Sequence, residues 1–394
     1  MNTTKVLVVY HFFPHYRKGV IEEMLKSEEA EYFFAASDTA EVIAPSIKAY
    51  IPENNYSKLI IKKVFRGLYW LSNIDNAIKD INPSVIIFLG DMNCLNAWIS
   101  AIRWRIYGKR VLFWAHGWNK DNEKFLKSKI RNLFFKIPQQ ILLYGRRARK
   151  IAVNHGFDPK KIYVIYNSLD YYNQVEIRKN TSREAANQFL LSKFPEFDSN
   201  NGLILCSSRL TASKRFDLVI QAIANIDPSL RPALLIIGDG EEMENLRNSA
   251  GKYNVKTYFF GACYDENELS RCFLVADVLV SPGNVGLSAM HAMVYGLPVI
   301  THADRNKQMP ETESVIDGKT GLLYDEGDVD SLRDAIYKML SFPEEVKEKM
   351  RTNCVNVIDS YFNPYFQVKK INLAVSGQAE YEDVSDSLEI DFIK

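Results

Sequence analysis

The chain has 394 residues, of which 47% are apolar and 25% are charged. These fractions are close to the average for folded globular proteins and exclude an intrinsically disordered chain. The formal net charge of +1, from 49 basic and 48 acidic residues, gives no overall attraction to nucleic acid or to a membrane. At this length we expect two domains rather than one core.

The cysteines and the apolar runs indicate the compartment. Cys94, Cys206, Cys263, Cys272 and Cys354 form no C-x-x-C pair, so we expect reduced thiols rather than disulfides or a metal cluster. The chain starts on a strand-like run without a charged and apolar leader, and no apolar run is as long as a membrane span. We therefore expect a cytoplasmic protein that is soluble or peripheral on the inner face of the plasma membrane.

The first half of the chain predicts alternating strands and helices. Helical patterns at 19–26 and 94–107 lie among apolar runs at 6–10, 31–34, 85–89, 110–114, 150–153 and 162–165. These runs are continuously apolar rather than alternating. This is typical of parallel strands that are covered by helices on both faces.

The second half repeats the plan. Strands are predicted at 203–206, 233–237, 255–260 and 277–280, and helices at 215–224, 241–247, 266–275 and 287–295. Two successive α/β halves predict two doubly wound, Rossmann-like domains that face each other across a cleft. Ligands of such sheets bind at the carboxyl ends of the strands, so we expect the site in this cleft.

The domain boundaries follow from composition. We expect an N-terminal domain over residues 1–170 and a C-terminal domain over 201–357, joined by a polar connection at 171–200. An aromatic-rich last helix, about 343–373, is expected to pack its C-terminal part (about 358–377) back on the first domain. The acidic residues 378–394 lack apolar periodicity and are expected to form a poorly ordered tail.

Three segments that follow predicted strands have the composition of anion-binding sites. Arg209 and Lys214, five residues apart, suit the charges of a diphosphate. The run 238–240 (Gly-Asp-Gly) lets a ligand approach the backbone, and the turn at 281–286 precedes a helix whose N-terminus attracts anions. Each pattern alone also fits an ordinary solvated loop, and the two interpretations stay open for each.

Together, these motifs resemble a known family in their order and spacing. The chain carries Arg209-Leu210 with Lys214, Gly238-Asp239-Gly240, Ala276-Asp277-Val278, A-M-x-x-G-L-P-V-I at 292–300, and D-G-K-T-G-L-L at 317–323. In the first half, Asn154-His155-Gly156 and the run 161–170 agree with it. The chain is similar to the nucleotide-sugar glycosyltransferases of GT-B fold, in particular to the retaining glycosyltransferase family 4 (glycosyl transferases group 1).

The resemblance implies an activity and a role for each domain. A hexosyl or deoxyhexosyl group would move from a nucleoside diphosphate sugar to an acceptor with its anomeric configuration retained. The first domain would be the acceptor side and the second would bind the nucleotide sugar. The expected acceptor is a saccharide or lipid-linked saccharide in surface polysaccharide or glycolipid synthesis.

The resemblance gives the cationic pair a catalytic role. Arg209 and Lys214 match the family's diphosphate-binding pair and would offset the charge that develops on the leaving group. No cofactor is implied besides the donor substrate, and no metal, since the sequence has no Asp-x-Asp-type ligand cluster. Further donor contacts are expected from Gly238, Asp239, Gly240, Asn284, Val285, Gly286 and Leu287.

The sequence departs from the family at two positions. The family's signature is a glutamate, seven residues and a second glutamate before the A-M-x-x-G run, and here these positions hold Gly283 and His291. In the family the second glutamate holds ribose hydroxyls and the first lies beside the donor sugar. His291 can replace one ribose contact as a hydrogen-bond partner, or it is a packed core histidine.

The loop after the apolar run at 297–300 carries groups that could replace the missing carboxylate. Lys307, Glu311 and Glu313 are the candidates for contact with the donor sugar. Glu313 matches the family's later glutamate best by its distance to Asp317-Gly318, and Glu311 competes with it. The alternative is a solvated loop, which its place at a strand end makes the weaker interpretation.

The first domain supplies a further catalytic candidate and the acceptor candidates. His116 follows the strand at 110–114 and matches the family's cleft histidine near the reacting centre; the alternative is a capping or core histidine. The first strand-to-helix loop replaces the family's glycine-rich loop with bulky and basic side chains, His15, Tyr16 and Arg17, of which Arg17 is able to meet an acceptor phosphate. Asp91 and Asn93 are a second acceptor candidate or, equally, a helix N-cap.

The stretch 120–150 combines ten basic residues with aromatic and aliphatic ones. Such a helix lies on anionic lipid, or it is a solvated face with a core stripe, and the two interpretations are equal. A nucleic-acid partner is not expected, because no recognition motif accompanies the patch.

Two other functions compete with an active transferase. A binding or regulatory module could have kept the fold and lost turnover together with its two glutamates. Another GT-B enzyme, such as a sugar-nucleotide epimerase, would need carboxylates for proton transfer, and none is convincingly placed. Retention of Arg209, Lys214 and His116 favours the transferase.

Overall fold

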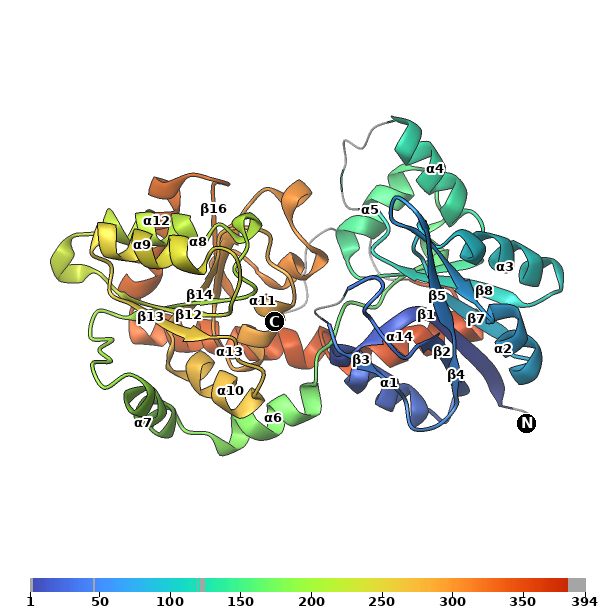
Figure 1. Ribbon diagram of the computed structural model, residues 1–394, viewed down its shortest axis with the longest axis horizontal. Coiled ribbons are helices and arrows are strands. Elements are labelled where there is room, and N and C mark those ends of the chain that lie inside the picture. The colour runs from blue at the N-terminus through green and yellow to red at the C-terminus, as the bar shows by residue number, and fades with distance from the viewer. Residues whose placement is uncertain (1–2, 45–46, 119, 121–124, 382–394) are drawn as a thin grey trace. The chain divides into compact units, whose positions relative to one another are not determined.

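The computed structural model describes residues 3–44, 47–118, 120 and 125–381. The chain divides into two compact units, which are coloured from blue to red along the chain in Figure 1. Unit 1 holds the described residues up to 170 and those from 361 to 381, and unit 2 holds 171–360. Most of the predicted tail 378–394 and part of the stretch 120–150 lie outside the described residues.

Unit 1 is built on a sheet in which the main strands run in the order β10-β9-β8-β7-β1-β2-β4. All these neighbours pair in parallel, and β3 adds an antiparallel pairing to the end of β1. A separate hairpin joins β5 (Ile60–Phe65) to β6 (Leu68–Ser72). The sheet strands are β1 (Thr4–Pro14), β2 (Ala30–Ser37), β3 (Ala49–Tyr50), β4 (Tyr56–Lys58), β7 (Val85–Leu89), β8 (Arg110–Ala115), β9 (Gln140–Leu143) and β10 (Ile162–Val164).

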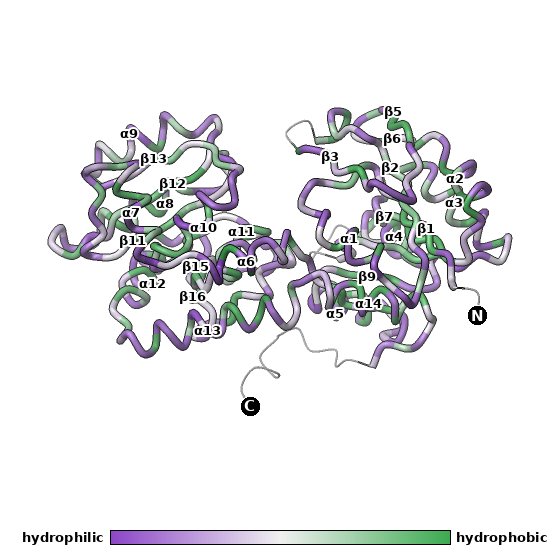
Figure 2. Tube along the Cα trace, turned by 90° about the horizontal axis from the view of Figure 1, so that it is seen from below, coloured by the Kyte–Doolittle hydropathy of each residue, from purple (hydrophilic) through white to green (hydrophobic). Residues whose placement is uncertain are grey.

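Helices cover both faces of this sheet. Leu7 and Val9 of β1 face a core shared with α2, α3, α4 and α5, while Val6 and Val8 face a core shared with α1 and α14. The continuously apolar strands follow from this double coverage, and Figure 2 shows the hydrophobic colour concentrated inside each unit. The helices are α1 (Lys18–Leu25), α2 (Ile74–Ile81), α3 (Leu95–Ile106), α4 (Phe125–Phe135), α5 (Arg146–Asn154) and α14 (Pro364–Ser376).

One predicted strand of unit 1 is wrong. Residues 150–153 belong to α5, and the strand at this place in the chain is β9, which the sequence did not predict. Ala148, Ile151 and Ala152 are buried at helical spacing, and a run as short as Ile151–Val153 does not distinguish a strand from one helix face. Because β9 is a core strand and Arg146 and Arg149 are buried, much of the stretch 136–150 is not a surface.

Unit 2 is a six-stranded parallel sheet in the order β13-β12-β11-β14-β15-β16. Its strands are β11 (Leu203–Ser207), β12 (Ala233–Ile237), β13 (Thr257–Gly261), β14 (Val278–Ser281), β15 (Val299–His302) and β16 (Gly321–Tyr324). Its helices are α6 (Tyr171–Asn180), α7 (Arg183–Lys193), α8 (Phe216–Ala224), α9 (Met243–Tyr253), α10 (Glu266–Val275), α11 (Leu287–Val294), α12 (Val329–Ser341) and α13 (Glu344–Tyr361).

The polar segment 171–200, expected as a connection, folds as α6 and α7 on α10 of unit 2. Gln174 donates to Glu266 at 3.2 Å, and Lys193 lies 2.9 Å from Glu268. Ile177, Ala186 and Leu190 are also buried, and the ring of Phe194 lies 5.1 Å from that of Tyr258, so apolar packing and these polar contacts together attach the segment to the unit.

The expected last helix is two helices. α13 ends at Tyr361, and α14 starts with Pro364 behind Asn363, whose side chain accepts from the Phe366 N–H at 2.9 Å. A proline at the first helical position with an Asn cap ends one helix and begins another. α14 packs on α1 of unit 1, and Arg110 of β8 donates to the carbonyls of Ala374 and Val375 near its C-terminus.

In each sheet the strand order reverses at one point. The chain leaves β1 toward β2 and returns to place β7 on its other side, and it likewise leaves β11 toward β12 and β13 before β14. A crevice forms at the carboxyl ends of such strand pairs, and this is where doubly wound sheets bind ligands. The topology therefore indicates that ligands bind near the loops after β1 and β7 in unit 1 and after β11 and β14 in unit 2.

Candidate functional site

The loop after β11 is held by backbone contacts with the Gly-Asp-Gly run. Leu210 N–H donates to the Asp239 carbonyl at 2.9 Å. A Cβ on Gly238 would lie 1.9 Å from the Ser208 carbonyl oxygen, and one on Gly240 would lie 2.3 Å from that of Leu210. The two glycines therefore allow the loops after β11 and β12 to touch, which supports the segment around Arg209. Direct contact of Gly238, exposed Asp239 and Gly240 with a donor stays a prediction.

The predicted cationic pair lies at the switch point of unit 2. Arg209 is exposed, and no carboxylate pairs with it in the described ranges. Lys214 is half-buried in the turn η3 (Ala212–Lys214), and its Nζ donates to the Asn284 carbonyl at 3.0 Å and to Asn284 Oδ1 at 2.9 Å. Burial lowers the pKa of Lys214, and the nearby Glu311 carboxylate opposes this shift. The ammonium is thus aimed before any ligand arrives.

The structure explains why residue 283 is a glycine, which the sequence alone did not. Its N–H donates to the Lys214 carbonyl at 3.1 Å. A Cβ at this position would lie 2.2 Å from the Ser213 carbonyl oxygen. No side chain fits at position 283 while η3 lies against the turn after β14, because a Cβ there would meet backbone atoms.

The turn before α11 is only partly available to an anion. Val285, a predicted donor contact, already gives its N–H to Gln308 Oε1 at 2.7 Å, and its side chain is buried. Gln308 in turn donates to Thr301 Oγ1 at 2.8 Å. Gly286 precedes α11 and Leu287 begins it, so their N–H groups are among those that a helix start leaves without intrahelical acceptors.

His291 is packed into a polar network within unit 2. Its Nε2 lies 2.8 Å from Glu266 Oε1, and the same oxygen accepts from the Tyr295 hydroxyl at 2.6 Å and from Gln174 at 3.2 Å. Burial raises the pKa of Glu266, but the hydrogen bonds from these groups outweigh it and hold that pKa below its ordinary value. The ring also packs on Phe273, with centroids 4.7 Å apart.

Because its ring nitrogen bonds to Glu266 and its ring packs on Phe273, His291 has the contacts of a structural histidine. The ribose contact of His291 stays a prediction that these contacts do not favour. Glu266 was missed, because no motif marks a glutamate in the first turn of α10.

The three candidates in the loop after β15 differ in burial and in the groups that they contact. Lys307 is exposed and pairs with Glu326 at 2.8 Å. Glu311 and Glu313 are buried in the short helix η6 (Pro310–Ser314), which packs on α11. The Glu311 carboxylate raises the pKa of Lys214, which associates Glu311 with the cationic pair, whereas Glu313 matched the family spacing better.

In unit 1 the predicted acceptor residue Arg17 is buried. Its guanidinium donates to Asn167 Oδ1 at 2.8 Å and to the Tyr144 hydroxyl, and it lies over the rings of Trp114 and Tyr144 at 5.1 Å and 4.9 Å. Only 6% of Arg17 is exposed. The side chain turns into an aromatic cage, so its contact with an acceptor phosphate stays a prediction that this burial does not favour.

The other acceptor candidates lie nearer the surface. His15 is exposed and Tyr16 is half-buried. Asp91 accepts from the Tyr69 hydroxyl and from the Asn93 N–H, each at 2.9 Å, so its carboxylate stabilises the turn after β7. Asn93 itself is exposed.

His116 lies at the end of β8 beside the Arg17 cage, with its ring 4.7 Å from that of Tyr144. The residue is exposed, but the protein atoms around its imidazole displace much of the water that would stabilise the protonated ring. The positive charge of Arg17 disfavours protonation further. Together they lower the pKa of His116 to about 4, so the imidazole is neutral at physiological pH.

Sequence reasoning missed three residues of this edge: His11, Tyr144 and Asn167. Burial lowers the pKa of His11, and Asp91 and Arg17 also act on it. Tyr144 and Asn167 follow β9 and β10, and His11 lies in the last part of β1, so a place near the carboxyl ends of strands was the available signal.

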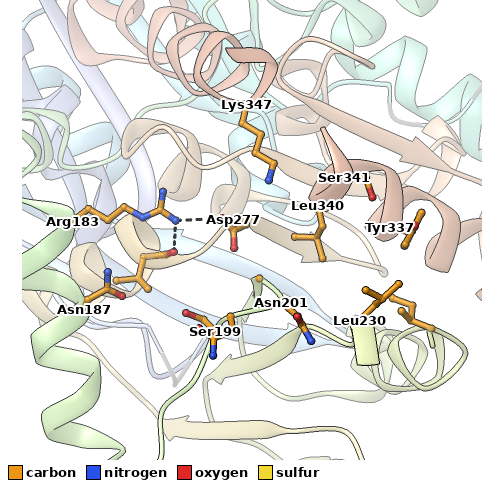
Figure 3. A pocket seen from close by; sticks show the side chains of 14 residues that line it. Arg183, Asn187, Ser199, Asn201, Leu230, Asp277, Tyr337, Leu340, Ser341 and Lys347 are labelled. Carbon is orange, nitrogen blue, oxygen red and sulfur yellow. Dashed lines mark hydrogen bonds and ion pairs between the residues drawn. The ribbon is translucent and has the colours of Figure 1, made fainter. Parts of the chain in front are cut away.

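A cavity of about 440 Å³ lies at the other edge of the unit 2 sheet, among the starts of β11 and β14 (Figure 3). Asp277 of the A-D-V motif pairs there with Arg183 at 3.2 Å and accepts from Leu203 N–H at 2.8 Å. None of the predicted site residues lines this cavity. Asp277 therefore joins α7 to the sheet rather than serving the cationic pair.

The described ranges contain no group of three or more His, Cys, Asp or Glu residues placed to hold a metal ion. No helix in them is long and apolar enough to cross a membrane.

Comparisons with known proteins agree with this geometry. Residues 188–356 match the family Glycosyl transferases group 1. A mannosyltransferase of Mycolicibacterium smegmatis, the GDP-mannose-dependent α-(1-6)-phosphatidylinositol monomannoside enzyme, is 32% identical over 157 residues, 36% of this chain and 39% of that protein. An uncharacterised protein of the Klebsiella pneumoniae cps region is 29% identical over 56% of this chain and 58% of its own length. The chain thus spans less than two thirds of these relatives.

Solved structures match over nearly the whole chain. A Rickettsia africae glycosyltransferase has a TM-score of 0.69 at 17% identity, covering 95% of this chain and 99% of its own. Anabaena HepE in complex with UDP has a TM-score of 0.68 at 14% identity, covering 95% and 100%. At such identities the likeness shows the fold alone. The chain therefore has the GT-B fold, and its residues 188–356 are similar to the glycosyl transferases group 1 family.

Proposed function

We propose that this protein is a retaining glycosyltransferase, of the family 4 type, that uses a nucleoside diphosphate sugar. The observation that carries the proposal is the placement of Arg209 and Lys214 at the switch point between β11 and β14. Two cations and the start of α11 face the crevice where a doubly wound sheet binds its ligand. A diphosphate is the group that this combination suits.

The cations act mainly on the leaving group. As the bond from the sugar to the diphosphate breaks, negative charge grows on the departing oxygen, and fixed positive groups lower the energy of that transition state. Arg209 offers a planar set of donors for two phosphate oxygens. Lys214 keeps one of its three ammonium donors for the ligand, since Asn284 takes two. We propose that these groups make a metal unnecessary.

The donor we propose is a UDP-sugar or a GDP-sugar: UDP and UDP-glucose occupy Anabaena HepE, which shares the fold, and the Mycolicibacterium relative is GDP-mannose-dependent, with UDP as the first probe. The sugar is a hexose or deoxyhexose. Gly283 has no side chain to contact the sugar. The buried Glu311, whose charge raises the pKa of Lys214, is our first choice for a contact with sugar hydroxyls. The neutral imidazole of His116 is the catalytic contribution of unit 1.

The acceptor we propose is a saccharide or lipid-linked saccharide of surface polysaccharide or glycolipid synthesis. The mycobacterial relative acts on a phosphatidylinositol mannoside, and the Klebsiella relative is encoded in a cps region. His15, Tyr16, Asp91 and Asn93 at the edge of unit 1 are its proposed contacts. The other proposed partner is an anionic membrane surface, and nucleic acid is not a partner.

The test is calorimetric binding of UDP together with donor hydrolysis over a panel of nucleotide sugars. Arg209→Ala or Lys214→Ala should each remove a charge-assisted bond of about 1.5–3 kcal/mol and lower UDP affinity at least about tenfold. Arg215→Ala is the matched control, because that neighbouring arginine is exposed and pairs with Asp217 at 3.3 Å.

The outcomes separate the alternatives. Unchanged UDP binding in both variants would refute the donor assignment. Tight UDP binding with no turnover of any nucleotide sugar would instead favour a binding module that has kept the fold.

A further inference from the structure

The outer faces of α3 and α4 expose an unusual number of large apolar side chains. On α3 these are Ile99, Ile102 and Ile106, followed by Tyr107; on α4 they are Phe125, Leu126, Ile130 and Leu133. Ile106, Phe125, Leu126 and Leu133 are each more than 60% exposed. We call these eight residues the α3–α4 face. Clustered exposure on this scale marks a surface that is covered by something else.

The spacing shows that this face is organised. Ile99, Ile102 and Ile106 recur at the interval of one helix face, while the opposite face of α3 packs Ala97, Ala101 and Trp104 into the core. Leu126, Ile130 and Leu133 form the same kind of stripe on α4. Helix α3 is thus apolar on two sides, and only one side is needed for folding.

The two helices form one continuous surface. Arg105 of α3 donates to the carbonyls of Lys136 and Ile137 just after α4, at 3.2 Å and 2.5 Å. Between the helices lies a groove of about 480 Å³ lined by Ile102, Arg105, Ile106, Leu133, Lys136 and Ile137. The groove is therefore apolar at its centre and basic at its margin.

The charge of the α3–α4 face indicates which kind of partner it can bind. The segments 95–118 and 125–140 contain no Asp or Glu, but they hold Arg103, Arg105, Lys109, Arg110, Lys127, Lys129, Arg131 and Lys136. Arg103 pairs with Asp75 of α2, and Lys129 lies over the Phe125 ring at 4.2 Å. Asp121 and Glu123 lie in the chain between the helices, outside the described residues. A second copy of this chain would bring the same positive face, which disfavours a symmetric dimer here.

We propose that the α3–α4 face docks on an anionic lipid bilayer, with the apolar stripes entering the interface and the basic side chains among the headgroups. The stretch 120–150 led to a similar idea from sequence, but the apolar stripe of α3 lies outside that stretch, and β9 and α5 within it are largely core. The docking rests on the membrane partner of the proposed function and assigns it to this face, and it does not depend on donor chemistry.

The test is flotation of the full chain with vesicles, without any donor. Vesicles of phosphatidylglycerol mixed with phosphatidylcholine are compared with phosphatidylcholine alone, at about 0.1 M and about 1 M salt, where the Debye length falls from about 10 Å to about 3 Å. We expect binding to the anionic vesicles at the lower salt and release at the higher. Equal binding to both vesicle types, or to neither, would overturn the proposal.

Two double variants separate the apolar and basic contributions. We expect at least about tenfold weaker binding to anionic vesicles from each of two double variants. Ile106→Ser with Leu133→Ser removes apolar area from the interface, and Lys127→Glu with Lys129→Glu removes two basic residues, each worth about fivefold. Ile60→Ser with Val64→Ser, and Lys62→Glu with Lys63→Glu, are the matched controls on the exposed strand β5 of the same unit. If the controls lose as much binding as the α3–α4 variants, the face is not the docking surface.

Two more measurements keep the result unambiguous. All four variants should hydrolyse a soluble nucleotide sugar like the wild type, so that failure of the proposed transferase activity is seen separately from failure of docking. Sedimentation at increasing protein concentration completes the test. A dimer that disappears in the Ile106→Ser, Leu133→Ser variant, without vesicle binding by the wild type, would assign the face to a second copy and overturn the proposal.

Discussion

Gly283 is the position at which one added carbon should disable the donor site. In a Gly283→Ala variant the new Cβ would lie 2.2 Å from the Ser213 carbonyl oxygen and 3.0 Å from Lys214 Cα. Since real Cβ contacts below 3.0 Å essentially never occur, η3 must retreat by about 1 Å. The atom in the way is backbone, so no side-chain rotation can relieve the contact.

The retreat moves Lys214 away from Asn284. Two hydrogen bonds, at 3.0 Å and 2.9 Å, now aim its ammonium. Loss of one charge-assisted bond to the diphosphate costs about 1.5–3 kcal/mol, so UDP affinity should fall about 10- to 150-fold. Isothermal titration calorimetry measures this directly, and thermal unfolding shows how far the turn itself is destabilised.

Gly286→Ala is the matched control in the same turn. The nearest atom to its added Cβ is Met309 Cγ at 3.8 Å, an ordinary contact, so UDP affinity should stay at the wild-type value. A Gly283→Ala, Lys214→Ala double variant should lose little more than either single variant, because both act through one ammonium. Additive losses, or wild-type affinity in Gly283→Ala, would refute the link between the glycine and the clamp.

Two further predictions concern the histidines. His291→Ala should lower the free energy of unfolding by about 1–3 kcal/mol, through the lost hydrogen bond to the Glu266 carboxylate, and leave UDP affinity unchanged, whereas a large loss of affinity with unchanged stability would restore the ribose interpretation. The pKa of His116 is depressed to about 4 in the folded protein, so the neutral form favours folding above the ordinary value of 6.5, and this contribution is lost as the pH falls toward 4. Urea unfolding across that range should show a shallower pH dependence in His116→Asn than in the wild type, and identical curves would contradict the assignment.

Much of the fold was predictable from local patterns. The run Val6–Tyr10 is apolar at every position because both faces of β1 are covered, and that signal needs no knowledge of the partner. It failed at 150–153, where three apolar residues fit one face of α5 equally well. Arg209 and Lys214 were found because a short motif places both on one loop after a strand.

The tertiary structure decided the roles that depend on distant neighbours. Gly283 meets Ser213, His291 meets Glu266, and Arg17 meets Asn167, pairs that are 25 to 150 positions apart. Sequence reasoning could name the residue types at each place but not their contacts, so it left the role of His291 open and did not predict the aromatic cage around Arg17. A side chain's function depends on what surrounds it after folding. The sequence determines that environment only through the packing of the whole unit.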